Sequence, residues 1–256
     1  MVFSCKLVQF FPREDVDYNF SIISSHILPK TITIFPEGSL SGYPTTINTA
    51  FFSTINSQQI RKLIDKLAEI CKTKKAVVVC SGIIDDEGDW KNRTFVISST
   101  GVDYYDKVNL ATHERGQITA GASLDPIEIE IGAETIVIGI QVCRELKFPE
   151  QWQLLSLKHS DLLIHLNNAV GDVSEQLMWK SQLIARATEN QRFVISVNAA
   201  AEDQKCPSMA IGPFGNTLVE MDSDESEAEI MIDPTKNSDW YMNQRATDVV
   251  EVIEHK

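Results

Sequence analysis

The feature that most constrains the fold of this chain is a series of short apolar runs rich in Val, Ile and Phe. The runs are CKLVQF (5–10), TITIF (31–35), AVVVCSGII (76–84), RTFVISS (93–99), TIVIGIQV (135–142), DLLIHL (161–166) and RFVISV (192–197). Several are almost continuously apolar instead of alternating, and this pattern predicts strands that are covered on both faces or packed sheet on sheet.

Helical patterns lie between these runs. Residues 58–73 repeat apolar side chains at the three-four spacing of an amphipathic helix. Residues 174–191 begin with Ser174 as the expected N-cap and continue in helix formers. Because strands alternate with helices, the sequence predicts a layered α/β fold. The chain has 256 residues, of which 43% are hydrophobic, and shows no break in composition, so we expect residues 1–256 to form a single domain.

The C-terminal part of the chain has a different pattern. Residues 207–232 predict two short strands around the turn PFGN, then an acidic solvated loop, then another strand, as a meander that closes the core. The tail from about residue 234 has little periodicity, and we expect it to wrap the surface or a partner subunit.

Charge and patterning exclude several kinds of partner. The formal net charge of −13 disfavours nucleic acid and anionic membrane surfaces, because both would repel the chain. The N-terminus lacks the features of a secretory signal, and no apolar run approaches the length of a membrane span.

The cysteines and histidines indicate free thiols and no metal site. The five cysteines are widely spaced, with no CxxC pair, which fits the reducing environment of the cytoplasm. The histidines lack the spacing typical of zinc ligands.

Polar residues follow several of the apolar runs directly. Glu37 comes just after TITIF, Cys143 follows TIVIGIQV, Asn167 and Asn168 follow DLLIHL, and Asn198 follows RFVISV. Ligands collect at the carboxyl ends of strands in open α/β sheets, so these residues are candidates to converge on one cleft.

Cys143 differs from the other thiols in its neighbours. Cys5, Cys71 and Cys80 lie inside apolar patterns and are expected to pack in the core. Cys143 stands where a strand pattern stops, and the adjacent Arg144 would favour the thiolate that a nucleophile must supply.

A nucleophilic thiol also needs a base and an oxyanion partner. No histidine stands in an obvious partner position, and the glycine-flanked nucleophile elbow is absent, which leaves a carboxylate as the alternative base. Glu37 lies in the rigid turn FPEGSLSGYP, although an exposed surface turn would have the same sequence. Lys107, in YYDKVNLATHERGQITAG, would supply a fixed positive charge, although a lone lysine after a strand is ordinarily solvated.

Together these motifs resemble the nitrilase superfamily of carbon-nitrogen hydrolases. FPE after a strand, YDK, and VCRE before a second FPE occur in the order of that family's Glu-Lys-Cys set, and ARATENQRFVISVN (185–198) resembles its RA-EN helix and following strand. Four separated motifs agree in order and spacing, and together they span most of the chain.

The resemblance implies a four-layer αββα sandwich that pairs as a homodimer or a higher homo-oligomer. It implies that Cys143 is the nucleophile, Glu37 the general base and Lys107 the oxyanion-stabilising cation. Glu114 matches a second glutamate that positions the substrate or the lysine, and the backbone N–H of Arg144 is expected at the oxyanion. No metal or organic cofactor is required.

Departures from the family pattern leave the substrate open. Glu145 and Lys147 replace an aspartate and an arginine after the nucleophile, and the longer Glu145 is expected to change the pocket wall. We expect Trp179 to lie in the core and His113 to be a solvated loop residue. Candidate pocket residues are Arg144, Asn167 and Asn168, and Arg144 or Arg115 is the candidate partner for the distal carboxylate of an ω-amide.

The implied reaction is hydrolysis of a small amide or ω-amide through a thioester, with release of ammonia or an amine. An N-carbamoyl amidohydrolase or a nitrilase of the same family remains an alternative. Two other classes also stay open, a catalytically silent binding or scaffold member and an acyltransferase in which an amine resolves the thioester.

Overall fold

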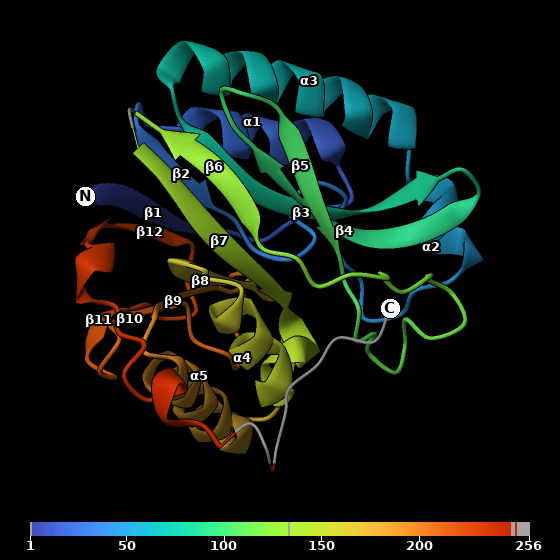
Figure 1. Ribbon diagram of the computed structural model, residues 1–256. Helices are drawn as coiled ribbons and strands as arrows, with labels where there is room; N and C mark the ends of the chain where they lie inside the picture. The colour runs from blue at the N-terminus through green and yellow to red at the C-terminus, as the bar shows by residue number, and fades with distance from the viewer. Residues whose placement is uncertain (1, 133, 247–248, 250–256) are drawn as a thin grey trace.

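The computed structural model describes residues 2–132, 134–246 and 249. Two six-stranded sheets lie face to face, and helices cover the outer face of each sheet (Figure 1). The four-layer αββα sandwich predicted from the sequence is therefore confirmed.

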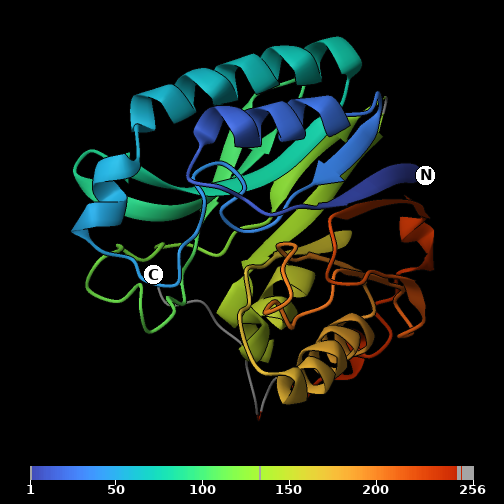
Figure 2. The ribbon, with the colours of Figure 1, turned by 180° about the vertical axis from the view of Figure 1, so that it is seen from behind.

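The first sheet has the strand order β12-β1-β2-β3-β4-β5. Its strands are β1 (Phe3–Gln9), β2 (Thr31–Ile34), β3 (Val77–Asp86), β4 (Asp89–Ile97), β5 (Val102–Asp106) and β12 (Ser226–Ile232). Helices α1 (Val16–His26) and α3 (Ser57–Lys74) lie side by side on its outer face (Figure 2), and the short α2 (Thr49–Thr54) precedes α3.

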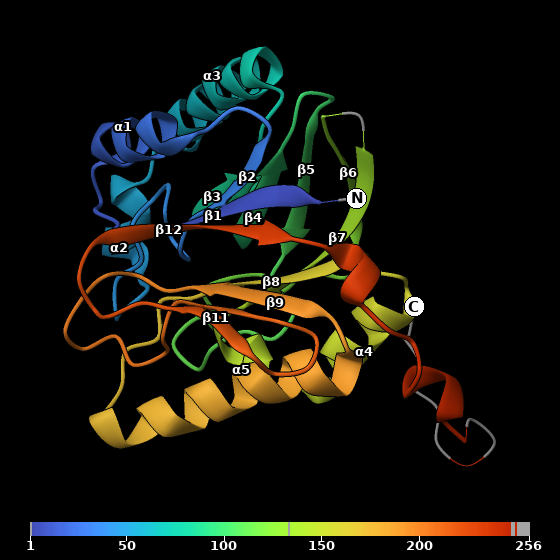
Figure 3. The same ribbon diagram turned by 90° about the vertical axis from the view of Figure 1, so that its left-hand side faces the viewer.

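The second sheet has the strand order β11-β10-β9-β8-β7-β6. Its strands are β6 (Ile127–Ile131), β7 (Glu134–Val142), β8 (Leu162–Leu166), β9 (Phe193–Val197), β10 (Met209–Ile211) and β11 (Thr217–Glu220). Helices α4 (Pro149–Leu157) and α5 (Gln176–Asn190) cover its outer face (Figure 3). Short 3₁₀ turns occupy Cys143–Lys147, Val173–Glu175, Pro234–Lys236 and Met242–Gln244.

The main hydrophobic core lies between the two sheets, because the central strands bury both faces. Leu7, Ile34 and Val79 from the first sheet belong to the same fully buried cluster as Ile138 and Ile164 from the second. Burying each such side chain contributes roughly 1.5–3 kcal/mol relative to leaving it in water. A second buried cluster joins the first sheet to α1 and α3.

The strand directions bring the polar strand ends together. β1, β2 and β3 run parallel in one sheet, and β7, β8 and β9 run parallel in the other. Parallel strands end at the same edge of a sheet, so the segments that follow β2, β7 and β8 meet at one side of the sandwich, where Glu37 N donates to Asn167 O at 3.2 Å.

Two sequence expectations about local structure are wrong. β12 does not continue a meander: the loop at 221–225 carries the chain to the other sheet, where β12 pairs antiparallel with β1 and covers an otherwise open edge. Ser174 is not the N-cap of the following helix, because Asp172 caps a separate 3₁₀ turn and α5 begins only at Gln176.

The described part of the tail lies on the surface beside α5 and β9. Arg192 Nη1 donates to Ser238 O at 2.8 Å, and Asn237 Nδ2 donates to Asp161 O at 2.7 Å. The end of the predicted tail, residues 247–248 and 250–256, lies outside the described residues. Within the described ranges, no helix has both the length and the apolar composition needed to cross a membrane.

Candidate active site

Glu37 is presented by a tight turn that follows β2. Gly38 in this turn has φ +75°, and a Cβ added there would lie 2.5 Å from the Cβ of Tyr43, so both the backbone conformation and the available space require glycine. Gly38 N donates to Ser81 Oγ at 2.9 Å, and Leu40 N donates to Ser81 O at 2.8 Å, which fastens the turn to β3. Glu37 is fully buried, so the alternative of an exposed surface turn is wrong.

A compact set of buried polar groups surrounds the Glu37 carboxylate. Glu37 Oε1 accepts hydrogen bonds from Lys107 Nζ at 3.0 Å and from Asn92 Nδ2 at 2.8 Å. Glu114 Oε1 accepts from the same two groups, at 3.1 Å from Lys107 and 2.7 Å from Asn92. All four side chains are buried, so Lys107 is a fixed cation and not a solvated lysine.

The environment separates the pKa values of the two carboxylates. Burial raises the pKa of Glu37, although the Lys107 charge opposes this effect. Burial would also raise the pKa of Glu114, but the Lys107 charge and the hydrogen bonds from Tyr43 and Asn92 outweigh it, so the pKa is lowered. Burial alone would lower the pKa of Lys107, but the charges of Glu37 and Cys143 raise it, so the ammonium stays protonated. The arrangement leaves Glu37 as the group best suited to take up a proton.

One oxygen of Glu37 has no hydrogen-bond partner among the described residues. Glu37 Oε2 is buried and receives no donor, while Oε1 is fully engaged. Buried carboxylate oxygens are normally paired, so an unpaired one beside a thiol is a candidate proton acceptor.

Cys143 stands at a strained turn between β7 and the 3₁₀ turn that it opens. Its φ of +49° lies in the left-handed region, which costs roughly 1–2 kcal/mol for a non-glycine residue. The glycine-flanked elbow is absent from the sequence, yet the strand-nucleophile-helical turn geometry is present without it. The Cys143 pKa is raised by burial and by the nearby Glu37 carboxylate, with the Lys107 charge opposing, so the thiol needs a base to ionise.

Buried side chains hold the carbonyl groups of this turn. His165 Nε2 lies 2.9 Å from Cys143 O, Trp152 Nε1 donates to Glu145 O at 3.0 Å, and Arg186 Nη2 donates to Leu146 O at 2.7 Å. With its carbonyls turned toward the protein interior, the turn keeps a fixed backbone path beside the nucleophile.

The tautomer of His165 follows from its two partners. Cys143 O can only accept, so Nε2 carries the proton and Nδ1 accepts from the Ser196 hydroxyl at 3.0 Å. Burial lowers the pKa of His165 to about 4, so the ring is neutral near pH 7.

Glu145 does not alter the pocket wall as the sequence suggested, because its side chain points into the protein. Its Oε1 accepts from Tyr105 Oη at 2.7 Å and from the backbone N–H groups of Val108 and Asn109 at 2.9 Å. Its Oε2 accepts from Val142 N at 2.8 Å. Burial raises the pKa of Glu145 to about 7, while these donors favour the ionised form.

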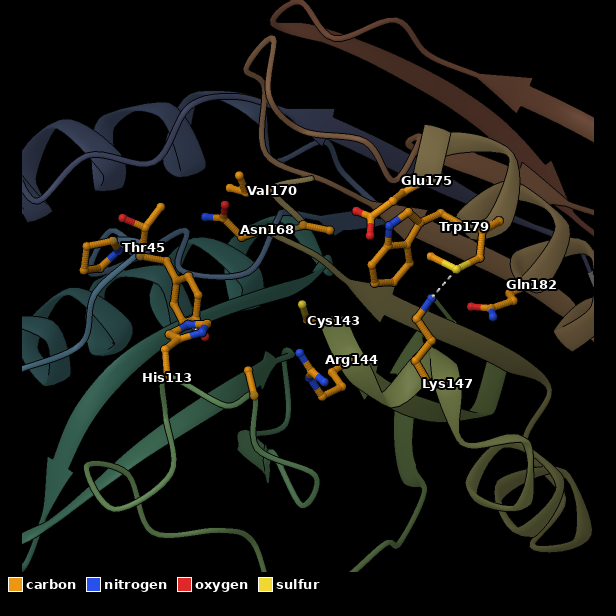
Figure 4. Close-up of a pocket in the computed structure, with 15 residues that line it drawn as sticks. Thr45, His113, Cys143, Arg144, Lys147, Asn168, Val170, Glu175, Trp179 and Gln182 are labelled. Carbon is orange, nitrogen blue, oxygen red and sulfur yellow. Dashed lines mark hydrogen bonds between the residues drawn. The ribbon is translucent and has the colours of Figure 1, made fainter. Parts of the chain in front are cut away.

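Cys143 opens on a cavity of about 630 Å³ (Figure 4). The cavity is lined by Tyr43, Pro44, Thr45, Ala111, His113, Cys143, Arg144, Lys147, Asn168, Ala169, Val170, Glu175, Met178, Trp179 and Gln182. Arg144 and Asn168 therefore lie where the sequence placed them. Asn167 and Arg115 are not part of the lining, and the Asn167 side chain is buried behind it.

Two residues line the cavity in addition to having the environment expected from the sequence. His113 is an exposed loop residue, as expected, but it also lines the cavity, where its Nε2 lies 3.1 Å from Tyr43 Oη and partial burial lowers its pKa. Trp179 belongs to the core as expected, but it also forms part of the cavity wall.

Asn92 and the role of Tyr43 were not predicted from the sequence. Tyr43 Oη donates to Glu114 Oε1 at 2.6 Å and closes the buried cluster on the cavity side. Asn92 lies in β4, whose sequence DWKNRTFVI mixes polar and apolar residues, and its partners are distant in the sequence, so no local signal marked it.

The family follows from a comparison of the whole sequence. The sequence model described as carbon-nitrogen hydrolase matches residues 21–237. The chain belongs to the carbon-nitrogen hydrolase family.

Relatives of this hydrolase include amidases and a nitrilase. It is 24% identical over 239 residues to an (R)-stereoselective amidase of Pseudomonas sp., covering 89% of this chain and 84% of the relative. It is 26% identical over 237 residues to a protein of Schizosaccharomyces pombe named as a nitrilase, covering 85% and 84%. A 2-oxoglutaramate amidase of Paenarthrobacter nicotinovorans is 25% identical over 174 residues, covering 62% of this chain and 58% of that protein. These relatives support carbon-nitrogen hydrolase activity on a small molecule.

Solved structures share the fold of the hydrolase. A carbon-nitrogen hydrolase from Helicobacter pylori G27 matches with a TM-score of 0.84 and 17% identity, over 96% of both chains. An amidase from Nesterenkonia sp. AN1, which carries the acetamide moiety of fluoroacetamide on its active-site cysteine, matches with a TM-score of 0.79 and 17% identity, over 96% of this chain and 95% of that chain.

No group of three or more His, Cys, Asp and Glu side chains within residues 2–132, 134–246 and 249 is placed to hold a metal ion. The two carboxylates of the buried cluster accept hydrogen bonds from the Lys107 ammonium and the Asn92 amide.

Proposed function

We propose that the hydrolase cleaves the C–N bond of a small amide through a thioester on Cys143. In the first step the Cys143 thiol gives its proton to Glu37 Oε2, and the thiolate attacks the carbonyl carbon of the amide. The C–N bond then breaks, Glu37 returns the proton to the leaving nitrogen, and ammonia or an amine departs.

A water molecule completes the cycle. Glu37 takes a proton from the water, the oxygen attacks the thioester carbon, and the S–C bond breaks to release the carboxylic acid. The proton held by Glu37 restores the Cys143 thiol. One amide and one water thus give one acid and one ammonia or amine.

Charge develops on the carbonyl oxygen in both steps. Lys107 is the proposed electrostatic partner of that oxyanion, because its buried ammonium cannot relax away as charge forms. The backbone N–H of Arg144 is the proposed second donor, since it lies at the start of a 3₁₀ turn where N–H groups have no acceptor within the turn. Glu114, ionised and hydrogen-bonded to Lys107, holds the ammonium in place.

The observation that carries this proposal is the unpaired Oε2 of Glu37. It gives the buried carboxylate one free basic oxygen, while the other oxygen fixes Lys107 and Asn92. The raised pKa of Glu37 supports its service as acid and base near neutral pH.

The test is release of ammonia from a panel of small amides, ω-amides, carbamoyl compounds and nitriles. We expect turnover by the parent and none by Cys143→Ala, and intact mass should detect an acyl adduct on the parent only. Cys206→Ala, which removes another buried thiol, is the matched control and should keep its activity. Absence of turnover and of any adduct would overturn the proposal, and formation of a new amide with added amines would make the protein an acyltransferase.

We also infer that the hydrolase forms a homodimer and works in a reducing compartment such as the cytoplasm. Trp240 and Tyr241 support the first inference, because they pack against each other in the tail while remaining 60% and 55% exposed. The five free thiols support the second. Light scattering of the parent beside Trp240→Ser tests the dimer, and a monomeric parent would exclude it.

A further inference from the structure

Lys147 is a cation in the cavity that makes no ion pair with any acidic residue in the described part of the chain. It is the last residue of the turn that begins at Cys143, and its Nζ lies 4.0 Å from the centre of the Trp179 ring and 3.4 Å from Met178 Sδ. Neither contact neutralises its charge, and within the described ranges Lys147 makes no ion pair. Lysines this close to an aromatic wall are stabilised only modestly by it, so the ammonium is available to an anion.

Glu175 is an acid on the wall of the same cavity. Its backbone is fixed by the capped turn in which Glu175 N donates to Asp172 O at 2.9 Å. Its carboxylate lies so close to Gly171 that a Cβ there would come within 2.1 Å of Oε2. In the part of the chain that the structure describes, this carboxylate has no hydrogen bond and no ion pair, although its charge acts on Lys147.

These opposite charges lie at one end of the cavity. In Figure 4, Cys143 is central, Thr45 and His113 are on one side, and Glu175, Trp179 and Lys147 are on the other. A molecule that places an amide at Cys143 therefore has room to place a charged group at the far side.

We infer that the preferred substrate is an α-amino acid whose side chain ends in a primary amide. Its carboxylate would bind Lys147, its ammonium would bind Glu175, and its side chain would lie along Trp179 to bring the amide to Cys143. This inference rests on the proposed function, because it requires the reacting amide to be held at the Cys143 thiol.

Charge complementarity favours an α-amino acid amide over an amide that carries only one charged group. A ligand with only a carboxylate would satisfy Lys147 but bring a like charge toward Glu175, and a ligand with only an ammonium would do the reverse. A zwitterionic group matches both. Arg144, which also lines the cavity, adds positive charge near Cys143 in a chain whose formal net charge is −13, and this favours entry of the carboxylate.

The test uses three amides of equal chain length, run at several lengths. The first carries the α-ammonium and the α-carboxylate, the second carries only the carboxylate, and the third carries neither charge. We expect kcat/KM of the parent to rise by about tenfold or more from the third to the second, and again from the second to the first, as charge-assisted hydrogen bonds are added.

Two variants test which residue is responsible for each of the two increases in kcat/KM. Lys147→Met should remove most of the preference of the second compound over the third. Glu175→Gln should leave that preference and remove the preference of the first over the second. Lys180→Met and Glu220→Gln, which break an exposed ion pair of 2.7 Å that does not line the cavity, are the matched controls and should preserve both ratios.

The outcomes separate the two proposals. If the parent hydrolyses the uncharged amide as well as the zwitterionic one, the inference fails while the thioester mechanism stands. If Glu175→Gln keeps the full preference for the zwitterionic compound, the assignment of Glu175 is wrong. If no amide is turned over, calorimetric titration of Cys143→Ala with the three compounds still tests binding, and equal affinities would overturn the inference.

Discussion

Glu145 Oε1 accepts the backbone N–H of Val108 at 2.9 Å, and this contact joins the segment just after Lys107 to the turn that begins at Cys143. The two segments come from different sheets, since Lys107 follows β5 and Cys143 follows β7. A single buried carboxylate therefore sets the relative position of the cation and the thiol.

We predict that Glu145→Gln lowers both stability and kcat. An amide nitrogen cannot accept, so at least one of the N–H groups now bonded to Glu145 is left unpaired, which costs about 1–3 kcal/mol. Denaturant unfolding measures the stability, and turnover at saturating amide measures kcat. Unchanged values in both experiments would show that the carboxylate has no such positioning role.

Glu37→Gln should lower kcat by about 10²–10⁴-fold, because the amide retains an oxygen for Lys107 and Asn92 but removes the proposed base. The chain offers a matched control, since Phe148, Pro149 and Glu150 repeat the tripeptide of Phe35, Pro36 and Glu37. Glu150 is exposed, and Glu150→Gln should turn over amides like the parent. Similar rates for the two variants would remove Glu37 from the mechanism.

Asn92→Ala should move the acidic limb of the kcat/KM profile to higher pH. The hydrogen bond from Asn92 lowers the pKa of Glu37, so removing it raises that pKa, and a higher pH is then needed to ionise the base. Asn237→Ala, which removes an amide remote from the cavity, provides the control profile. A limb that stays in place, or moves to lower pH, would contradict this role of Asn92.

His165 should make the fold less stable as pH falls from 6.5 toward 4. Its folded pKa is lowered to about 4 from 6.5, so in this window the unfolded chain binds a proton that the folded chain does not. The full effect is about 3 kcal/mol, from a difference of 2.5 in pKa at 1.36 kcal/mol each. The raised pKa values of Glu37 and Glu145 act in the opposite direction, so the measurement is the difference between parent and His165→Gln, which should lose this pH dependence. Parallel unfolding curves at every pH would contradict it.

The repeated tripeptide shows what local sequence can and cannot predict. At Phe35, Pro36 and Glu37 it follows a buried strand and enters a glycine turn, so its glutamate is fully buried. At 148–150 the same residues begin α4, with the proline at the first turn of the helix. The strand ends and the order of the motifs were enough to predict Glu37, Lys107, Glu114 and Cys143 as site residues. Each of them is recognised from the segment that precedes it in the sequence.

The remaining features depend on contacts between distant segments. Asn92 reaches Glu37 and Glu114 across 55 and 22 positions, and no periodicity in β4 distinguishes it from a residue that merely packs. The place of the exposed His113 in the cavity lining was not predicted, because a polar loop sequence does not reveal that the loop borders a cavity. The pairing of β12 with β1 was not predicted for a similar reason, because the composition of this strand fits the edge of either sheet.

The pairing of β12 with β1 has a consequence for how the chain is made on the ribosome. Ser4 and Glu229 lie 225 positions apart yet share a hydrogen bond of 2.6 Å across these strands. During translation, one edge of β1 therefore has no partner strand until β12 has left the ribosome. The sheet whose strand β2 precedes Glu37 is completed only then. The first sheet thus gains its β12 edge only after the segments that carry Glu37, Lys107 and Cys143 have all been made.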